Sequence, residues 1–453
     1  MKNANQSALF TDLYELTMLQ AYFTQHMTEQ ATFSLFARRL PPRRNFLLAC
    51  GLDSVLEYLD KLRFTDGDLD YLRSLDKFSG PFLDWLQDFS FTGEVRAVAE
   101  GTPVFANEPI LEVTAPLPEA QVAETFIMNQ IHVQTVLATK AQRIVAAAKG
   151  RPVVDFGARR MHGTDAALKA ARAFYIAGVA ATSNVLAGQR YGLPLSGTMA
   201  HSYVQAHESE EQAFLEFARL YPDTVLLVDT YDTLAGVRKV ISLASRLGKQ
   251  FRVKSLRLDS GDLLALSKEA RQLLDAAGLQ GIGLFASGGL DEDAIGALLA
   301  ANAPIDGFGV GTSMGVSNDA PDLDIVYKMC AYAGSGRLKL STGKPVLPGS
   351  KQVFRLADGD RDVRDVIARA GEDLPGRPLL TCVMRNGKRL DTGAADLDTA
   401  RRRAGEQIAR LPDGVQAISP AASAFPVEIS AALAGYRDEV AAVVRSQQDI
   451  RKS

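Results

Sequence analysis

From Pro152 to about residue 320, short apolar runs alternate with stretches of helical periodicity, and this alternation restricts the fold more than any other feature. The apolar runs are PVVDFG, LPLSG, TVLLVDT, VKSLRLDSGD, GIGLFASGG and IDGFGVGTS. Helical patterns, such as those of residues 165–188 and 232–250, separate them. Buried strands that alternate with helices indicate parallel βαβ units. Six units in about 170 residues predict an irregular βα barrel, with an open doubly wound sheet as the alternative.

Each apolar run ends in glycines and polar residues. In chain order these endings are DFGARRMHG, SGTMAH, VDTYD, RLDSGD, SGGLDED and GVGTSMGVSND. The carboxyl ends of the strands of a βα barrel meet on one face, where the loops build the active site. The six polar clusters therefore predict one shared site on that face.

The flanking sequence predicts a second, β-rich domain that is discontinuous in the chain. Residues 8–26 have helical periodicity, with Thr11 as the expected cap, and residues 89–116 show several short strands. A long helix is expected over 121–149, strands return after Lys328, and a last amphipathic helix is expected at about 430–445. The expected limits are residues 1–119 and 331–453 for the two parts of the β-rich domain and 120–330 for the barrel.

Composition limits the classes of partner. The 453 residues are 47% hydrophobic and carry a formal net charge of -3, which does not favour binding to nucleic acid. Three scattered cysteines form neither a disulfide framework nor a zinc cluster and suit a reducing cytoplasm. The start of the chain shows no signal-peptide pattern, and no apolar run is long enough to span a membrane.

Glycine turns after the last two strands suggest a phosphate site. They are SGG, with Gly288 and Gly289, and GVGTS, with Gly311 and Thr312. Glycine lets backbone N–H groups approach an anion, and late-strand turns of barrels often bind phosphate. Tight turns alone would also explain the glycines.

Arginines and aspartates at the same strand ends suit an anionic or hydroxylated ligand. Arg257 lies within an apolar strand and needs a partner, whereas Arg159 and Arg160 could be solvated loop residues. Asp229, Asp232, Asp259 and Asp262 could hold sugar hydroxyls or Mg²⁺. Capping of the following helices is the more economical interpretation of Asp232 and Asp262.

Two of the five histidines, His201 and His207, lie in SGTMAHSYVQAHE. Their spacing of six puts them on different helix faces, and no cysteine or spaced carboxylate completes a zinc site. The Ser202-x-x-Gln205 pattern predicts a capping box, with His201 immediately before the helix. That position disfavours an imidazolium and suits a neutral imidazole that can accept a phosphoryl group. His26, His132 and His207 are expected to be structural or exposed, and the role of His162 stays open.

Together these motifs resemble the nicotinate phosphoribosyltransferase family, from TDLYELTM near the start to LPGSKQVFR around residue 350. The resemblance implies an irregular α/β barrel of the type II phosphoribosyltransferase kind, with a β-rich second domain, in a homodimer with shared active sites. It implies that nicotinate and 5-phosphoribosyl-1-diphosphate give nicotinate mononucleotide and diphosphate, the first step of NAD salvage from nicotinate. It also implies Mg²⁺, and ATP as a co-substrate whose hydrolysis proceeds through a phosphohistidine.

The resemblance also assigns roles to single residues. His201 matches the phosphorylated histidine, and Asp229 matches its orienting acid. Phe156 and Tyr14 match the aromatic pair around the pyridine, with Tyr14 supplied by the partner subunit. The remaining matches are Arg257 and Thr198 for nicotinate, Arg159 and Asp259 for the phosphoribosyl group, and Gly288, Gly289, Gly311 and Thr312 for the 5-phosphate. Mg²⁺ would be held mainly by substrate phosphates. The last 60 to 70 residues resemble the family less, and the cysteine-rich C-terminal zinc site of some relatives is absent.

Two alternatives remain open at this point. The sister enzyme that uses nicotinamide has an aspartate where Ser183 lies here, which favours the acid over the amide as substrate. A non-catalytic nucleotide sensor would have no reason to keep a histidine beside phosphate turns. A Schiff-base aldolase is disfavoured, because the only candidate lysine, Lys254, lies at the start of its strand.

Overall fold

The computed structural model describes residues 7–340, 346–394 and 396–450, and the chain divides into two compact units. The first unit contains residues 1–139 and 322–453, and the second is the single segment 140–321. The second unit therefore lies in the chain between the two parts of the first. Among the described residues, no helix has both the length and the apolar character needed to cross a bilayer.

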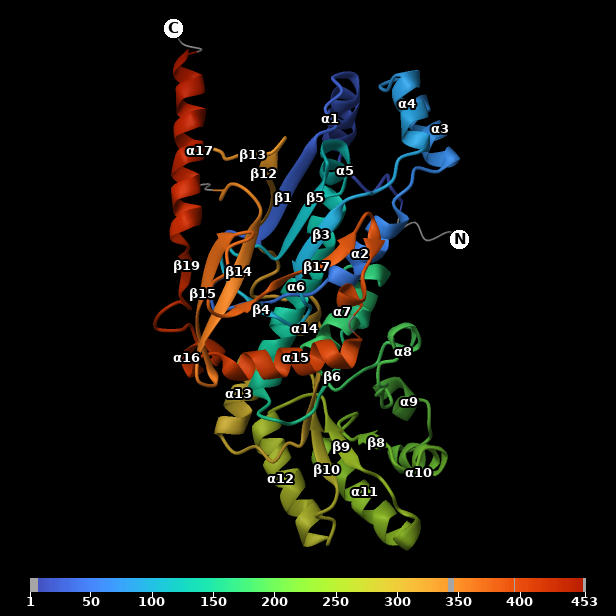
Figure 1. Cartoon of the computed structure of the whole chain (residues 1–453). Helices are drawn as coiled ribbons and strands as arrows, with labels where there is room; N and C mark the ends of the chain where they lie inside the picture. The colour runs from blue at the N-terminus through green and yellow to red at the C-terminus, as the bar shows by residue number, and fades with distance from the viewer. Residues whose placement is uncertain (1–6, 341–345, 395, 451–453) are drawn as a thin grey trace. The chain divides into compact units, whose positions relative to one another are not determined.

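The second unit is built on one parallel sheet with the strand order β7-β6-β11-β10-β9-β8. Figure 1 labels four of these strands, β6, β8, β9 and β10. Its strands are β6 (Val153–Asp155), β7 (Ala181–Thr182), β8 (Val225–Leu227), β9 (Ser255–Leu258), β10 (Gly283–Ala286) and β11 (Gly307–Val310). The end strands β7 and β8 have no pairing with each other in the described part of the chain, so the sheet is a curled half-barrel.

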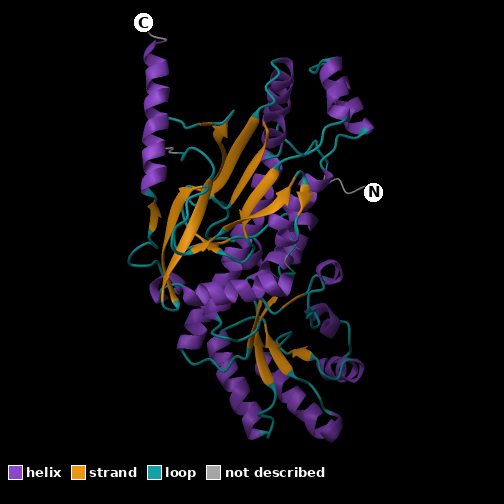
Figure 2. Cartoon of the chain, viewed as in Figure 1, coloured by secondary structure: helices purple, strands orange, loops and turns teal. Residues whose placement is uncertain are grey.

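Helices follow the strands of this sheet, as the alternating pattern predicts (Figure 2). They are α7 (Thr164–Ile176), α8 (Val185–Tyr191), α9 (His201–Gln205), α10 (Glu210–Leu220), α11 (Thr233–Leu247), α12 (Leu263–Ala276), α13 (Glu292–Ala300) and α14 (Thr312–Gly315), with 3-10 turns η2 (Ala158–Arg160) and η3 (Gly248–Gln250). Side chains of Asp232, Asp262 and Asp291 accept hydrogen bonds from the first turns of α11, α12 and α13. The capping interpretation of Asp232 and Asp262 is thus confirmed.

Two local predictions in this unit are wrong. LPLSG forms no strand, and only Leu195 makes an isolated parallel bridge to Thr182. The strand in that place is β7, within the stretch 165–188 that was expected to be helical. Gly178, at φ +107°, ends α7 in a conformation that glycine adopts without strain, and the chain then extends into β7.

The first unit contains the β-rich part. Its largest sheet has the order β13-β12-β1-β5-β3-β17-β18, so three strands from the first part of the chain lie between strands from the last part, and both parts build it, as expected. These strands are β1 (Gln30–Ala37), β3 (Glu94–Val98), β5 (Leu111–Pro116), β12 (Ile325–Tyr332), β13 (Ser335–Gly336), β17 (Leu380–Arg385) and β18 (Lys388–Arg389). Strand β1 is buried at all positions but the first, because β5 and β12 flank it.

Two smaller sheets complete the strands of this unit. A four-stranded sheet has the order β16-β14-β15-β19, and β2 pairs with β4. The strands are β2 (Leu47–Leu48), β4 (Pro103–Val104), β14 (Lys351–Asp358), β15 (Arg361–Arg369), β16 (Arg377–Pro378) and β19 (Val427–Ile429). Arg355 on β14 is fully buried and forms a bidentate ion pair with Asp365 on β15, which removes the cost of an unpaired buried charge.

The helices of the first unit are α1 (Leu13–Thr24), α2 (Leu52–Lys61), α3 (Asp66–Ser74), α4 (Gly80–Gln87), α5 (Leu117–Val122), α6 (Glu124–Ala147), α15 (Leu397–Arg410), α16 (Asp413–Gln416) and α17 (Ala431–Ile450), with the 3-10 turn η4 (Asp391–Gly393). Helix α6 continues past residue 139 into the second unit. The N-cap of α1 is Asp12 and not Thr11, because the Thr11 hydroxyl donates to Glu15 instead of accepting from the helix.

The predicted fold class is confirmed: an α/β unit with a curled parallel sheet accompanies a β-rich unit assembled from both ends of the chain. The core of the α/β unit is formed by residues such as Leu226, Leu256 and Leu284, which lie on adjacent strands and have no exposed surface. Their burial against α10, α11 and α12 fixes the strand ends that carry the polar clusters.

Candidate active site

A cavity of about 510 Å³ opens at the carboxyl ends of the parallel strands. Its lining includes seven of the residues that the sequence singled out: Phe156, Arg159, Ser183, Thr198, His201, Arg257 and Asp259. They come from three of the six polar clusters, DFGARRMHG, SGTMAH and RLDSGD, and from the residue after β7. The structure thus brings these residues to one place, as parallel strands with a common direction require.

Arg257 is held by three side chains. Its Nε donates to Oγ of Ser287 over 2.8 Å, Nη2 donates to Oδ1 of Asp259 over 2.6 Å, and Nη1 donates to Oγ1 of Thr198 over 3.3 Å. The guanidinium carbon also lies 5.3 Å from the centre of the Phe156 ring. With a side chain only 14% exposed, Arg257 is a fixed cation at the cavity wall.

Asp259 links this arginine to the histidine. Its Oδ1 accepts from Ser287 over 2.5 Å, and its Oδ2 lies 3.7 Å from Nε2 of His201. Burial alone would raise the pKa of Asp259, but the hydrogen bond from Ser287 and the charge of Arg257 outweigh it and hold the pKa below its ordinary value. The site therefore contains a stable carboxylate between a permanent cation and an imidazole.

His201 is the first residue of α9, after the N-cap Ala200, and its side chain is 40% exposed. The predicted capping box is wrong, because the helix starts one residue earlier and no side chain caps it. Nδ1 of His201 lies 3.2 Å from Oγ1 of Thr230. Since a hydroxyl can donate or accept, Thr230 is compatible with either neutral tautomer of the ring.

Asp229 lies beneath the cavity wall and is 9% exposed. Its Oδ2 accepts from the backbone N–H of Asp259 over 2.9 Å and from Oγ of Ser260 over 2.6 Å. Oδ1 is buried and has no hydrogen-bond partner. In this structure Asp229 fixes the backbone of the RLDSGD segment, and its role as the orienting acid of His201 stays a prediction.

Ser183 and its neighbour Thr182 differ in exposure. Thr182 is buried, and its hydroxyl donates to Oδ2 of Asp155 over 2.7 Å. Ser183 is exposed and lines the cavity. Of these two adjacent hydroxyls, only that of Ser183 is available to a ligand.

The predicted phosphate residues lie at the ends of β10 and β11 and do not line the cavity of 510 Å³. Gly288 has φ +89°, and a Cβ there would come within 1.9 Å of the Asp259 carbonyl oxygen. Gly289 has φ +65°, with open space where a Cβ would point. Gly311 is the N-cap of the short helix α14, which Thr312 begins. Their binding of phosphate stays a prediction.

Tyr14 belongs to the first unit, where it lies on α1 with 47% of its surface exposed. Burial of the hydroxyl and the nearby charge of Glu124 raise its pKa. The phenol is therefore neutral at physiological pH.

His132 and His207 have structural surroundings, whereas His26 and His162 are exposed. Nε2 of His132 accepts from the backbone N–H of Leu323 over 2.9 Å, and burial lowers its pKa. Nδ1 of His207 lies 2.8 Å from the carbonyl oxygen of Tyr203. Within the described residues, no group of three or more His, Cys, Asp or Glu side chains could hold a metal ion.

Sequence reasoning missed three hydroxyl residues that hold the site together: Ser287, Thr230 and Ser260. Each lies in a motif that was recognised, but serine and threonine beside glycine or aspartate are common in turns. The only sequence signal was their position one to three residues after a buried strand.

Two family models match this chain. The nicotinate phosphoribosyltransferase (NAPRTase) N-terminal domain matches residues 9–132, and the nicotinate phosphoribosyltransferase (NAPRTase) family matches residues 152–370. Together they cover most of the chain.

Individual proteins agree with the family models. Nicotinate phosphoribosyltransferase pncB2 of Mycobacterium tuberculosis is 56% identical over 428 residues, which are 94% of this chain and 92% of the relative. Nicotinate phosphoribosyltransferase of Bacillus subtilis is 43% identical over 357 residues, 77% of this chain and 73% of the relative. The crystal structure of human nicotinic acid phosphoribosyltransferase superposes with a TM-score of 0.84 at 27% identity, covering 95% of this chain and 99% of the human one.

Proposed function

The chain belongs to the nicotinate phosphoribosyltransferase family, and from this membership we propose how its residues share the reaction. An enzyme of this family joins nicotinate to 5-phosphoribosyl-1-diphosphate, giving nicotinate mononucleotide and diphosphate in the salvage of NAD. The observation that supports our proposal most is that Asp259 connects the fixed cation Arg257 to His201 inside one cavity. The pyridine end and the phosphoryl-transfer end of the site would then meet at this carboxylate.

Nicotinate binds against the guanidinium of Arg257. Its carboxylate would pair with Arg257 and accept from Thr198 and Ser183, while the ring lies on Phe156. The pyridine nitrogen then attacks C1 of the ribose as diphosphate leaves. Oriented contact of the two substrates supplies much of the rate enhancement in such a displacement. Arg159 and Asp259 would contact the phosphoribosyl group, and the turns with Gly288, Gly289, Gly311 and Thr312 would bind its 5-phosphate.

His201 couples ATP hydrolysis to this reaction. A ring nitrogen forms a bond to the γ-phosphorus of ATP as the bond to ADP breaks, and water later hydrolyses the phosphohistidine. Oδ2 of Asp259, 3.7 Å from Nε2, would stabilise the positive charge that the ring gains. Thr230 would hold the other side of the ring through Nδ1, and Asp229 would support the backbone beneath.

Mg²⁺ would be bound mainly through substrate phosphates. The Asp232 and Asp262 side chains already cap helices, and Oδ1 of Asp259 already binds Arg257 and Ser287. These carboxylates fit a site that adds one or two oxygens to a cation held by phosphates, but not an all-protein cage. When bound, the cation would neutralise charge on the transferred and leaving phosphates.

The pyridine site would be completed by Tyr14 of the partner subunit in a homodimer. The support is that Tyr14 is neutral and half-exposed on α1. Its ring could therefore stack on a pyridine bound by the partner subunit. Mixing inactive Tyr14→Ala and Arg257→Ala subunits should restore activity by forming one intact site in each heterodimer. Proven heterodimers with no more activity than the parents would place Tyr14 in its own subunit's site.

The reaction would take place in the cytoplasm. All three cysteines, Cys50, Cys330 and Cys382, are free thiols, as in a reducing compartment. Fluorescence microscopy or fractionation of the tagged protein would test this placement.

One assay tests the function. The enzyme is incubated with 5-phosphoribosyl-1-diphosphate, Mg²⁺ and either nicotinate or nicotinamide, with and without ATP, and the mononucleotide is quantified. We expect nicotinate mononucleotide as the product and stimulation by ATP. A preference for nicotinamide would reassign the substrate, and neither mononucleotide formation nor ATP hydrolysis would indicate a non-catalytic sensor.

A further inference from the structure

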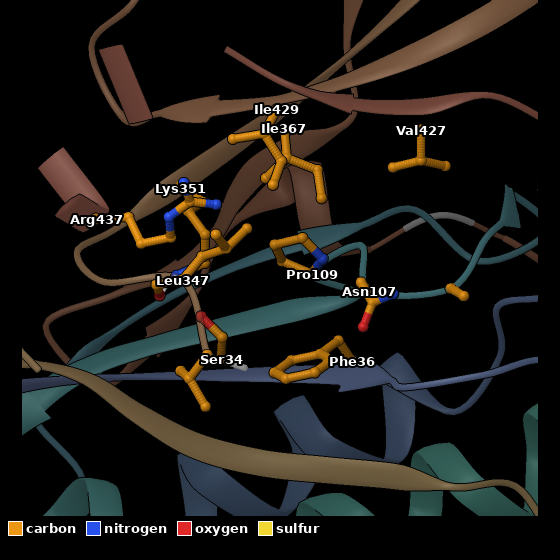
Figure 3. A pocket seen from close by; sticks show the side chains of 12 residues that line it. Ser34, Phe36, Asn107, Pro109, Leu347, Lys351, Ile367, Val427, Ile429 and Arg437 are labelled. Carbon is orange, nitrogen blue, oxygen red and sulfur yellow. Dashed lines mark hydrogen bonds between the residues drawn. The ribbon is translucent and has the colours of Figure 1, made fainter. Parts of the chain in front are cut away.

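A second cavity lies wholly within the β-rich unit and takes no part in the reaction above. Its volume is about 280 Å³, and 12 described residues line it (Figure 3). They come from β1, the turn before β5, the segment before β14, the strands β14, β15 and β19, and α17. Strands of both larger sheets of the unit and the last helix therefore line it.

The lining is mostly apolar. Eight of the 12 residues are hydrophobic or proline, among them Phe36, Pro109, Leu347, Ile367, Val427 and Ile429. An apolar cavity of roughly 150 Å³ in another protein is large enough to bind benzene. A cavity of 280 Å³ therefore has room for an octyl chain or a bicyclic ring.

Charge at the cavity has one sign. Lys351 and Arg437 line it at one end, and no carboxylate is among its described lining residues (Figure 3). Lys351 is buried and already satisfied by Glu112, 3.0 Å away, and by the carbonyl oxygens of Leu347 and Gly349. A ligand would therefore have to use Arg437.

Arg437 keeps donors for a ligand. Its Nε and Nη2 both point to one oxygen of Asp438 over 2.9 Å, and its side chain is 42% exposed. Asp438 is 70% exposed and does not line the cavity, so water screens its effect there. The remaining guanidinium N–H groups suit an anion, above all a carboxylate.

We propose that this cavity is a binding site for small apolar carboxylates, with the hydrocarbon part in the cavity and the carboxylate on Arg437. The apolar walls supply affinity, and the single charged group fixes the orientation, as in most small-molecule sites. The site is separate from the catalytic cavity, whose residues all lie in the other unit.

Binding of octanoate to the full-length protein, measured by titration calorimetry, tests this proposal. Octanol and octylamine, which have the same chain with no charge or the opposite charge, test the role of Arg437. In the methyl-labelled protein, octanoate should shift the methyl resonances of Ile367, Val427 and Ile429. We expect saturable octanoate binding, weaker binding of octanol and none of octylamine.

Variants locate the site. Arg437→Gln should weaken octanoate binding about tenfold through loss of a charge-assisted hydrogen bond, whereas Arg445→Gln, on the same helix, should not change it. Val427→Phe and Ile429→Phe fill the cavity and should abolish binding, whereas Val443→Phe, at an exposed position of α17, should not. Ile429 is 40% exposed, so its substitution leaves the fold intact even if Val427→Phe does not.

Three results would overturn the proposal. They are no saturable binding of octanoate at millimolar concentration, equal binding of octanoate and octylamine, and octanoate binding that folded Ile429→Phe retains. The first excludes the site, the second excludes the role of Arg437, and the third places the ligand elsewhere.

Discussion

Nε of Arg257 donates a hydrogen bond to Oγ of Ser287 over 2.8 Å, between the carboxyl ends of the adjacent parallel strands β9 and β10. The same hydroxyl donates to Asp259, so Ser287 sets the positions of both the cation and the carboxylate. Ser287 is buried, with 2% of its surface exposed, and is not among the residues that line the cavity. It is a positioning residue for the proposed nicotinate site.

Ser287→Ala should therefore raise the KM for nicotinate more than it lowers kcat. Loss of a hydrogen bond to a charged group costs about 1.5–3 kcal/mol, so kcat/KM should fall by roughly one to two orders of magnitude. Ser287→Cys should recover part of the loss, and Ser245→Ala, on the exposed side of α11, serves as the control. Equal kinetics of Ser287→Ala and the wild type would show that Arg257 needs no such support.

His201→Ala should abolish nicotinate-stimulated ATP hydrolysis, because no ring nitrogen remains to accept the phosphoryl group. Some mononucleotide synthesis without ATP should remain, since the pyridine nitrogen is itself the nucleophile. The measurement is phosphate release with and without nicotinate, beside phosphate transfer from γ-labelled ATP to the protein. His207→Ala, six residues further along and beyond the end of α9, is the control. Full ATP coupling in His201→Ala would exclude the phosphohistidine.

Ser183→Asp should shift the substrate preference from nicotinate towards nicotinamide. A carboxylate beside that of nicotinate, at ~4 Å and an effective dielectric constant of about 20, costs on the order of 4 kcal/mol before relaxation. The amide group of nicotinamide would instead donate to it. Competition assays with both substrates measure the change, and Ser183→Asn provides a neutral side chain of the same shape. An unchanged preference would show that Ser183 does not face the ring substituent.

The sequence predicted much of the site because parallel strands bring all their carboxyl ends to one edge, so the polar residues that follow β6, β8, β9, β10 and β11 could only converge. It did not predict which side chains face one another there. Asp229 and Thr230 are adjacent, and nothing in their order indicates that Thr230 contacts His201 while Asp229 points to the backbone of Asp259. The two-residue strand β7 was missed because it is too short for any periodicity to appear.

Glu15 makes the docking of α1 sensitive to pH. It is fully buried and accepts from the backbone N–H and the hydroxyl of Thr125, and burial raises its pKa from 4.5 to about 7. A carboxyl whose pKa is raised on folding binds its proton more tightly when folded, so stability falls as pH rises from about 4.5 through 7. Above that range, the ionised Glu15 carboxylate lowers the free energy of unfolding by about 3 kcal/mol.

Glu15→Gln should remove this pH dependence, because an amide does not ionise. The melting temperature of the wild type should fall relative to that of the variant between pH 5 and 8, a window chosen around the pKa of about 7. Glu439→Gln, at an exposed position of α17, should follow the wild type. Parallel melting curves of the wild type and Glu15→Gln across this window would mean that Glu15 does not bind a proton there.

Gly288 and Gly289 are adjacent, and substitution by alanine should affect them very differently. Both have positive φ, which costs a residue with a Cβ about 1–2 kcal/mol. At Gly288 the Cβ would also meet the carbonyl oxygen of Asp259 at 1.9 Å, and that oxygen belongs to the backbone that Asp229 holds. At Gly289 it would enter open space.

Gly288→Ala must therefore displace the RLDSGD segment, and with it Arg257 and Asp259. We expect it to lose nearly all activity and several degrees of melting temperature. Gly289→Ala should keep the fold and lose only the about 1–2 kcal/mol that its positive φ costs. A rise in its KM for 5-phosphoribosyl-1-diphosphate would then report the proposed phosphate contact directly. Similar melting temperatures and activities of the two variants would show that the turn relaxes freely and does not fix the site.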